Sequence, residues 1–289
     1  MTVAWPSELD PWIVNRIQSS LKSPQSVLLL TPEELSVNAG ISLATAGEVI
    51  AVISQYMSPP SQTGLQLLQR HSTIRSGITS LDSALGGGFK PSWLVEIVGE
   101  AGSGKTQWAL TIAATSLLQG TQVYWIDTEN TFRPDRLLEM CNGDSRTLSS
   151  IHIRSGNSLS EIVDTFSLLS FLTHNKPPCL IVVDSVASIA RSQSSRLIDR
   201  NKVLHRLARL AKSLNAVTIV TNHVTANMND MSAPIKAALG NTWAHSLTCR
   251  FWLRKCEDGS ANRNLQVAKA PCLSFTTTVE ISKMGLTEL

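Results

Sequence analysis

The sequence predicts an α/β fold with a mostly parallel central sheet, preceded by a small all-helical domain. From Ile74 onward, short and almost continuously apolar runs alternate with helical stretches, which is typical of parallel strands covered on both faces. Residues 1–57 instead repeat apolar residues every three or four positions. Residues 58–64, SPPSQTG, have the composition of a linker. We therefore expect a helical domain over 1–57, a linker over 58–73 and an α/β core over 74–289.

Composition and charge are those of a globular protein with two unlike parts. The 289 residues are 43% hydrophobic and 16% charged, which argues against extensive disorder. Residues 1–57 carry two basic and five acidic side chains, a net charge of −3, so the total of +3 leaves +6 for the remainder. No apolar run approaches the roughly 18 residues that a membrane span needs, and no signal peptide is recognisable, so neither membrane association nor secretion is expected. Five cysteines without a CxxC pair favour a reducing compartment and no zinc site.

Three helices are expected in the N-terminal part. The first has an apolar residue at every fourth position: Leu9, Ile13, Ile17 and Leu21. In the second, TPEE places Thr31 before Pro32 and Glu34, the pattern of a helix start with a reciprocal capping box. A third helix follows the turn AGIS and reaches Met57. A small domain that only packs its own core would explain the same pattern.

Six strands and three long helices are expected in the core. The strand candidates are apolar runs at 94–99, 122–128, 150–154, 179–185, 217–222 and 249–255. The helices fall near 105–118, 159–173 and 199–214. After the strand that ends at Asn222 and His223, periodicity is lost as far as Pro234. A run of this kind inside a compact domain is usually either functional or disordered.

The segment GEAGSGKT fits the phosphate-loop pattern G-x-x-x-x-G-K-S/T, between an apolar strand and a helix. Its glycines let backbone N–H groups close around phosphate oxygens. Lys105 would reach the terminal phosphates, and the Thr106 hydroxyl would hold Mg²⁺. A purely structural glycine turn is the alternative. The predicted nucleotide-binding residues of this loop are Gly99, Glu100, Ala101, Gly102, Ser103, Gly104, Lys105 and Thr106.

Carboxylates at two other strand ends would complete an ATP–Mg²⁺ site. The run CLIVVDS delivers Asp184 to the carboxyl end of a strand, where open α/β sheets bind ligands, and this residue would orient the metal. YWIDTEN ends a strand with Asp127 and Glu129 on one face, since alternate side chains share a face. Glu129 lies further past the strand and is the better candidate for the base that activates water. Alternatively, both carboxylates cap the next helix.

Five segments, in order, resemble the RecA/RadA-type DNA recombinases: GEAGSGKTQ, YWIDTENTFRPDRL, LIVVDSVASIAR, TNHVT and AALGNTWAHSLTCRFWLRK. The likeness covers about residues 68–287, and the acidic helical start is similar to that family's small N-terminal domain. DSVAS and ALGNTWAHS most resemble the eukaryotic recombinase paralogues, nearest to the B paralogue. The resemblance implies a RecA-like P-loop ATPase core that binds ATP and Mg²⁺.

The resemblance also implies roles for residues outside the phosphate loop. Arg136, in TFRPDRL, would stack its guanidinium on the adenine ring, with a plain surface arginine as the alternative. Asn222 and His223 would report the presence of the γ-phosphate to the loop that follows them. His223 stands where the bulk recombinases usually have glutamine, and its charge depends on pH. The residues matching the family's catalytic and metal positions are Lys105, Thr106, Glu129 and Asp184.

Two loops resemble the family's DNA-binding loops, one near RSQSSRLIDR and one after TNHVT. Residues 189–212 hold seven Lys and Arg against a single acid, Asp199, which suits neutralisation of phosphates. A basic helix that is merely solvated is the alternative. The candidate DNA-binding residues are Arg191, Arg196, Arg200 and Lys236.

Two departures from the bulk recombinases concern assembly. Their linker carries a Phe-x-x-Ala tether, whereas this chain has Ser61 and Gly64 at those positions, so a homofilament is not expected. Lys269, in VAKAPC, stands where they tend to have an acid, and its cation could reach ATP held by an adjacent subunit. An ordinary exposed lysine is the alternative.

The expected function is that of a nuclear, ATP-dependent recombinase paralogue in homologous recombination and double-strand break repair, with weak DNA-dependent ATPase activity. The expected partners are single-stranded DNA, a non-identical paralogue subunit and the filament of the strand-exchange recombinase. One rival is a scaffold subunit that holds ATP as a structural clamp without hydrolysing it. A P-loop kinase is a more distant rival, because the sequence shows no pocket for a small acceptor.

Overall fold

The computed structural model describes residues 5–21, 23–57, 63, 73–173, 176–192, 197–226, 235–256, 260–271 and 275–289. Backbone contacts divide the chain into two compact units, residues 1–70 and residues 71–289. Each unit has its own buried apolar core.

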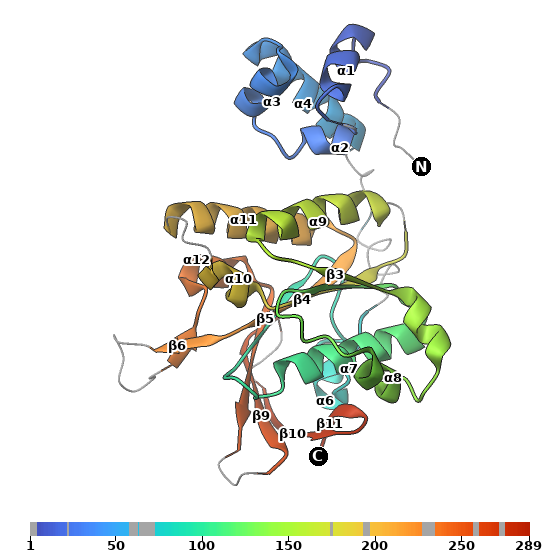
Figure 1. Ribbon diagram of the computed structural model, residues 1–289, viewed down its shortest axis with the longest axis vertical. Helices are drawn as coiled ribbons and strands as arrows, with labels where there is room; N and C mark the ends of the chain where they lie inside the picture. Colours follow the sequence, from blue (N-terminus) through green and yellow to red (C-terminus); the bar gives the residue numbers. More distant parts are fainter. Residues whose placement is uncertain are drawn as a thin grey trace. The chain divides into compact units, whose positions relative to one another are not determined.

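The N-terminal unit is helical throughout its described residues (Figure 1). The predicted capping box is present, because the Thr31 N–H donates to Glu34 Oε2 at 2.9 Å and the Glu34 N–H donates to Thr31 Oγ1 at 3.2 Å. The prediction of three helices missed a single-turn helix between the first two. No single helix of the described residues is long and apolar enough to cross a membrane. The helices Pro32–Ala39 and Leu43–Met57 have the length and composition of a membrane span only when taken together, and they are bent by 110° relative to each other. The helices are α1 (Pro11–Gln18), α2 (Pro24–Val27), α3 (Pro32–Ala39) and α4 (Leu43–Met57).

The larger unit contains a nine-stranded sheet with the order β11-β10-β9-β8-β1-β5-β4-β2-β3. The six strands from β8 to β3 in this order are mutually parallel, and β9, β10 and β11 extend the sheet in antiparallel fashion. All six predicted strands are therefore present, which confirms the mostly parallel sheet. The bounds are β1 (Leu94–Val98), β2 (Val123–Asp127), β3 (Ile151–Ser155), β4 (Cys179–Asp184), β5 (Ala216–Asn222), β8 (Cys249–Lys255), β9 (Asn262–Lys269), β10 (Thr276–Ser282) and β11 (Gly285–Glu288).

Helices cover both faces of this sheet, with α9 and α11 on one side and α7 and α8 on the other (Figure 1). On the α7 side, Trp108 is fully buried and its ring meets that of Phe251 edge-on at 5.3 Å. Val95 and Ile97 of β1 belong to the same core. The helices are α6 (Thr79–Ala84), α7 (Lys105–Leu118), α8 (Pro134–Met140), the 3₁₀ helix η1 (Ser145–Ser150), α9 (Leu159–Leu172), α10 (Val186–Ser192), α11 (Leu197–Ser213) and α12 (Gly240–Ser246).

A short antiparallel ribbon follows β5, formed by β6 (Val224–Ala226) and β7 (Ile235–Ala237). Its base is closed by a hydrogen bond from the Ala238 N–H to the His223 carbonyl, at 3.0 Å. The run expected to lack a regular pattern therefore begins with the short strand β6, and the strand β7 directly follows its last residue, Pro234. Cross-strand hydrogen bonds, rather than any pattern in the sequence, form this ribbon. Residues 227–234 lie outside the described residues.

The cysteines give no sign of a disulfide or metal centre in the described part of the chain. Cys141, Cys179, Cys249 and Cys256 form no disulfide within the described ranges, and Cys272 lies outside them. Burial raises the pKa of Cys179 to about 12, so this thiol stays protonated and unreactive. No group of three or more His, Cys, Asp or Glu within the described ranges is placed to hold a metal ion.

Candidate nucleotide-binding site

The phosphate-loop segment connects β1 to α7, in the strand–loop–helix context that the sequence predicts. Gly102 and Gly104 have φ angles of 70° and 105°, a region that residues with a side chain rarely adopt. A Cβ on Gly99 would lie 2.3 Å from the Leu253 carbonyl oxygen of β8, so a side chain cannot be accommodated there. The loop can thus follow its tight path only with glycine at these positions. Such a path suits a cradle of backbone N–H groups for phosphate.

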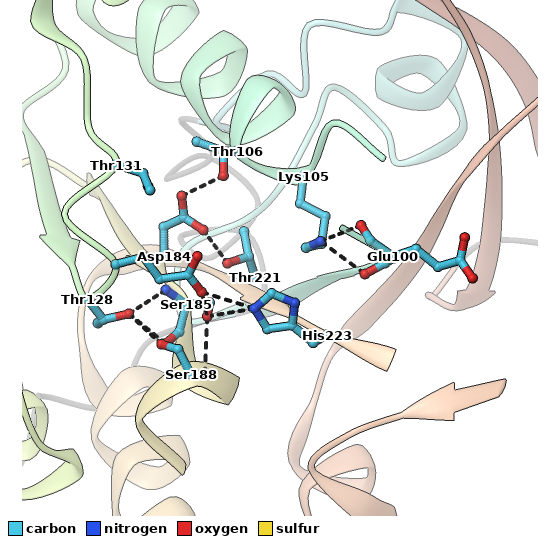
Figure 2. A network of polar contacts seen from close by, with 12 residues as sticks. Glu100, Lys105, Thr106, Thr128, Thr131, Asp184, Ser185, Ser188, Thr221 and His223 are labelled. Carbon is cyan, nitrogen blue, oxygen red and sulfur yellow. Dashed lines mark hydrogen bonds and ion pairs between the residues drawn. The ribbon is translucent and has the colours of Figure 1, made fainter. Parts of the chain in front are cut away.

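Lys105 is the first residue of α7 and is only 7% exposed. Its Nζ donates to the carbonyl oxygens of Gly99 at 3.0 Å and Glu100 at 2.8 Å (Figure 2). The loop's own backbone therefore holds the ammonium next to the cradle. Phosphate oxygens, which carry full charge, are stronger acceptors than these neutral carbonyls. The arrangement fits a polyphosphate ligand.

Asp184 ends β4, and its carboxylate is bracketed by two hydroxyls. Thr106 Oγ1 donates to Asp184 Oδ2 at 2.7 Å, and Thr221 Oγ1 of β5 donates to Oδ1 (Figure 2). Burial raises the pKa of Asp184, and the two hydroxyl hydrogen bonds offset only part of this rise; the negative charges of Glu129 and Asp127 add to it. A divalent cation would oppose that shift. A hydroxyl and a carboxylate beside a phosphate cradle are the donor set that Mg²⁺ takes in nucleotide sites, so the residues fit the metal.

Glu129 meets side chains from two other strand ends. Its Oε1 accepts from Ser185 Oγ at 2.6 Å and lies 3.0 Å from His223 Nε2. Burial alone would raise the pKa of Glu129, but the hydrogen bonds from Ser185 and His223, with the charges of His223 and Lys105, lower it overall. The carboxylate therefore stays ionised at neutral pH. An ionised, positioned carboxylate beside a phosphate site has the chemistry of a general base.

Asp127, two residues earlier, has a different role. Its carboxylate accepts the backbone N–H groups of Glu129 at 3.1 Å, Thr131 at 3.3 Å and Phe132 at 2.9 Å. The side chain therefore shapes the turn after β2, while Glu129 faces Ser185 and His223. Of the two carboxylates, Asp127 thus binds the backbone of the turn that precedes α8. The alternative that both carboxylates cap the next helix is wrong, because the first turn of α8 has no side-chain cap among the described residues.

The expectation that Asn222 and His223 act together as a relay is wrong for Asn222. Successive side chains of a strand point to opposite faces, so Thr221 and His223 face the site and Asn222 faces away. Asn222 is fully buried, and its Nδ2 donates to Glu96 Oε1 at 2.7 Å. Of the two residues, it is therefore His223 that connects Glu129 with the β6–β7 ribbon.

Two residues of this network were not predicted from the sequence, Ser185 and Thr221. Ser185 directly follows Asp184, and its N–H donates to Thr128 Oγ1 at 2.7 Å, which fixes the ends of β2 and β4 against each other. Both are hydroxyl residues at the carboxyl ends of buried strands. A small polar residue ending an apolar run is the signal by which they could have been found.

Arg136 and Lys269 both engage groups of their own chain. Arg136 Nε donates to Gln107 Oε1 at 3.0 Å, and Nη2 donates to the Ser282 carbonyl at 2.6 Å, which joins α8, α7 and the β10–β11 turn. Lys269 Nζ donates to the carbonyl oxygens of Ala244 at 3.0 Å and His245 at 3.4 Å, at the C-terminal end of α12. To reach ATP on a neighbouring subunit, Lys269 would have to release those carbonyls. Adenine stacking by Arg136 and the contact of Lys269 across subunits stay predictions.

The predicted DNA-binding residues that the structure describes are spread over three elements. Lys236 is exposed on β7, and Arg200 is half-buried on α11. Arg196 lies outside the described residues, as does the side chain of Arg191, whose backbone belongs to α10. Three further residues of the basic run 189–212 are exposed on α11: Lys202, Arg209 and Lys212.

The phosphate loop after β1, the hydroxyl–carboxylate pair at β4 and the mostly parallel sheet define a RecA-like P-loop ATPase core. The Rad51 family model matches residues 69–289, so the chain belongs to the Rad51 family. The human protein named DNA repair protein RAD51 homolog 2 is 29% identical over 91% of this chain and 82% of its own length. Its mouse counterpart is 29% identical over 94% and 93%. The DNA repair and recombination protein RadA of Methanoculleus marisnigri is 31% identical over 81% and 82%. These similarities confirm the resemblance to the recombinases and their B paralogue.

Proposed function

We propose that this chain is an ATP-dependent, DNA-binding recombinase paralogue that acts in the nucleus, in homologous recombination and double-strand break repair. The observation that carries the proposal is the convergence of Lys105, the Thr106–Asp184 pair and Glu129 at one edge of the sheet. The names of the relatives, which concern DNA repair and recombination, support the process.

ATP would lie along the phosphate loop, with Lys105 at its terminal phosphates and Mg²⁺ held by Thr106 and Asp184. The bound metal neutralises charge that develops on the phosphates. Glu129 then accepts the proton of the attacking water, since its lowered pKa keeps it ionised. Ser185 and His223 orient the Oε1 atom of Glu129. The chain would therefore be a weak ATPase, with Glu129 and Lys105 as its catalytic residues.

DNA would bind on the side of the core that carries the β6–β7 ribbon, which follows His223. Because the His223 ring contacts Glu129 and its carbonyl holds Ala238, a change at the ATP site can move the base of the β6–β7 ribbon. Lys236 on that ribbon and the basic residues of α11 supply cations for the phosphates of single-stranded DNA. Nucleotide state would thereby control DNA contact.

The partner would be a non-identical paralogue, and through it the filament of the strand-exchange recombinase. The edge strand β3 is exposed along most of its length, and an apolar cavity of about 800 Å³ lies beside it. Unpaired strand edges accept an added strand, and such a cavity suits an aromatic anchor from another chain. The cavity is lined in part by Trp125, Ile153, Leu168, Leu169 and Leu172.

Steady-state ATP hydrolysis, with and without single-stranded DNA, tests the ATPase. Lys105→Ala should abolish ATP binding, because the ammonium is the main counter-charge of the β- and γ-phosphates. Glu129→Gln should bind ATP as the wild type does but lose turnover by about 10²-fold or more. Asp164→Asn removes an exposed carboxylate on α9 and is the matched control, with unchanged turnover.

The outcomes separate the two versions of this function. Hydrolysis that survives Glu129→Gln unchanged would exclude Glu129 as the base. A wild-type chain that binds ATP tightly and does not hydrolyse it, with or without DNA, would favour the alternative of a scaffold subunit clamped by ATP.

A further inference from the structure

Two cations of the β8–β9 hairpin lie against the phosphate loop. Lys255 is the last residue of β8, and its Nζ lies 3.2 Å from the position that a Cβ on Gly102 would occupy. Arg263 is paired with Lys255 across the hairpin, and its Nε donates to the Ser103 carbonyl at 3.0 Å. Both side chains thus reach a loop that is remote from them in the sequence.

The two cations differ in how they are bonded. Besides Ser103, Arg263 binds the carbonyl oxygens of Ser260 at 3.1 Å and Asn262 at 2.8 Å, so its guanidinium is committed to backbone. Lys255, in contrast, makes no hydrogen bond or ion pair in the part of the chain that the structure describes. An ammonium that has no counter-charge among the described residues, and that rests on a phosphate cradle, is available to an anionic ligand.

Strand geometry directs Lys255 toward the loop. Alternate residues share a face, so Lys255 lies on the same face of β8 as Leu253, whose Cδ2 is 3.4 Å from the position of a Cβ on Gly104. Arg254 lies on the other face, where its guanidinium covers the Trp252 ring at 4.9 Å and its Nη1 donates to Gln266 Oε1 at 3.0 Å. Of these neighbouring cations, only Lys255 faces the phosphate loop.

Glycine at position 102 makes this approach possible. Its φ of 70° disfavours any side chain, and a Cβ there would stand 3.2 Å from Lys255 Nζ and 3.6 Å from Cε. The lysine side chain therefore occupies the space that a side chain of the loop would otherwise fill.

We propose that Lys255 is a second polyphosphate-binding cation of this site, supplied by the same chain from β8. It would contact phosphate oxygens of a bound nucleoside di- or triphosphate, opposite the cation that Lys105 supplies from α7. A compact ammonium on a flexible stem suits this contact, since it needs no fixed bidentate geometry. The proposal rests on the binding of ATP at the phosphate loop.

Nucleotide affinity of the full-length chain is the test, measured by calorimetric titration with ATP and with ADP in the presence of Mg²⁺. Lys255→Gln should weaken both affinities about tenfold, equivalent to about 1.4 kcal/mol. Lys255→Arg keeps the charge and should restore most of the affinity, which a purely space-filling role would not predict. Arg254→Gln removes the adjacent cation from the opposite face and is the matched control, with unchanged affinity.

Two results would overturn the proposal, and they are distinguishable. If the wild type binds ATP and Lys105→Ala abolishes binding, but Lys255→Gln binds as the wild type does, the role of Lys255 is wrong and the proposed function stands. If the wild-type chain binds neither ATP nor ADP, the proposed nucleotide site fails and the role of Lys255 fails with it.

Discussion

Among single residues, Asp127 and Glu129 show how neighbours on one turn acquire different chemistry. The Asp127 carboxylate is occupied by three backbone N–H groups, whereas Glu129 Oε1 is shared by a hydroxyl and an imidazole. The first arrangement makes a rigid turn, and the second leaves an ionised carboxylate facing the nucleotide site. Both side chains are carboxylates, but Asp127 is buried and Glu129 is exposed, so burial and hydrogen-bond partners together separate their roles.

The pH dependence of hydrolysis should report the environment of Glu129. Its pKa is lowered, so a rate that needs the ionised base persists as the pH falls and is lost only when the pH approaches that lowered pKa. Ser185→Ala removes the first of the hydrogen bonds that lower the pKa, and the acidic limb of the pH–rate profile should therefore move to higher pH. The measurement is ATP turnover between about pH 4 and pH 8.

Ser188→Ala is the control for that experiment. The Ser188 hydroxyl bonds Thr128 and the Ser185 carbonyl but not Glu129, so its removal should leave the limb where it is. An acidic limb that does not move in Ser185→Ala would show that Glu129 is not the group whose ionisation limits the rate.

At the scale of elements, α11 separates an apolar face from a basic one. Leu204, Leu207 and Ala211 are buried, whereas Lys202 and Arg209 occupy exposed positions of the helix. Neither Lys202 nor Arg209 forms an ion pair with another described residue. The predicted contact Arg200 is half-buried, and its Nε has no partner in the described ranges, so the outward cations are better probes of DNA binding.

Charge reversal on α11 tests whether this face binds DNA. Lys202→Glu combined with Arg209→Glu should weaken binding of single-stranded DNA without sequence preference. The slope of log affinity against log salt should flatten by about 0.7 for each lost phosphate contact. Arg133→Glu with Lys283→Glu, two exposed cations on α8 and the β10–β11 turn, matches the charge change and should leave the slope unchanged. An unchanged slope in the α11 variant would show that its basic face is only solvated.

The β6–β7 ribbon is anchored through a second set of contacts behind the site. Glu96 of β1 is fully buried and accepts from Asn222 Nδ2 and Trp243 Nε1, each at 2.7 Å, and from Arg250 Nε. Asn222 precedes the ribbon and Trp243 follows it, so one carboxylate holds both ends. A buried carboxylate requires such partners, because leaving it unpaired is strongly unfavourable.

At the scale of the whole molecule, the prediction concerns self-association. The two tether positions on which it depends, Ser61 and Gly64, lie outside the described residues. Light scattering with ATP, Mg²⁺ and single-stranded DNA should show a monomer or small oligomer for the chain alone. Ser61→Phe with Gly64→Ala should promote self-association, because burying a phenylalanine ring contributes about 1.5–3 kcal/mol.

The cavity beside β3 provides the control for this prediction. Leu168 and Leu172 line it and are 46% and 41% exposed, so Leu168→Glu with Leu172→Glu should reverse the association of the tethered variant without removing core contacts. Long homofilaments of the wild-type chain would contradict the proposed dependence on a non-identical partner.

The sequence alone was sufficient for the parts of this protein that local patterns specify. The apolar runs predict β1, β2, β4 and β5 because strands buried on both faces are almost continuously apolar, with few polar positions such as Glu96 in β1. The phosphate loop is readable because its glycines, lysine and threonine are contiguous. The antiparallel strands β9 to β11 were missed, since their polar and threonine-rich residues are only half-buried and read as loop.

The tertiary structure decided which side chains meet. Asn222 and His223 are adjacent in sequence, yet the pleat of β5 sends one to Glu96 and the other to Glu129. Ser185 joins Glu129, and Lys255 rests on Gly102, because strand order and register bring together residues that are far apart along the chain. Such meetings depend on long-range pairing, which no local pattern of one sequence encodes.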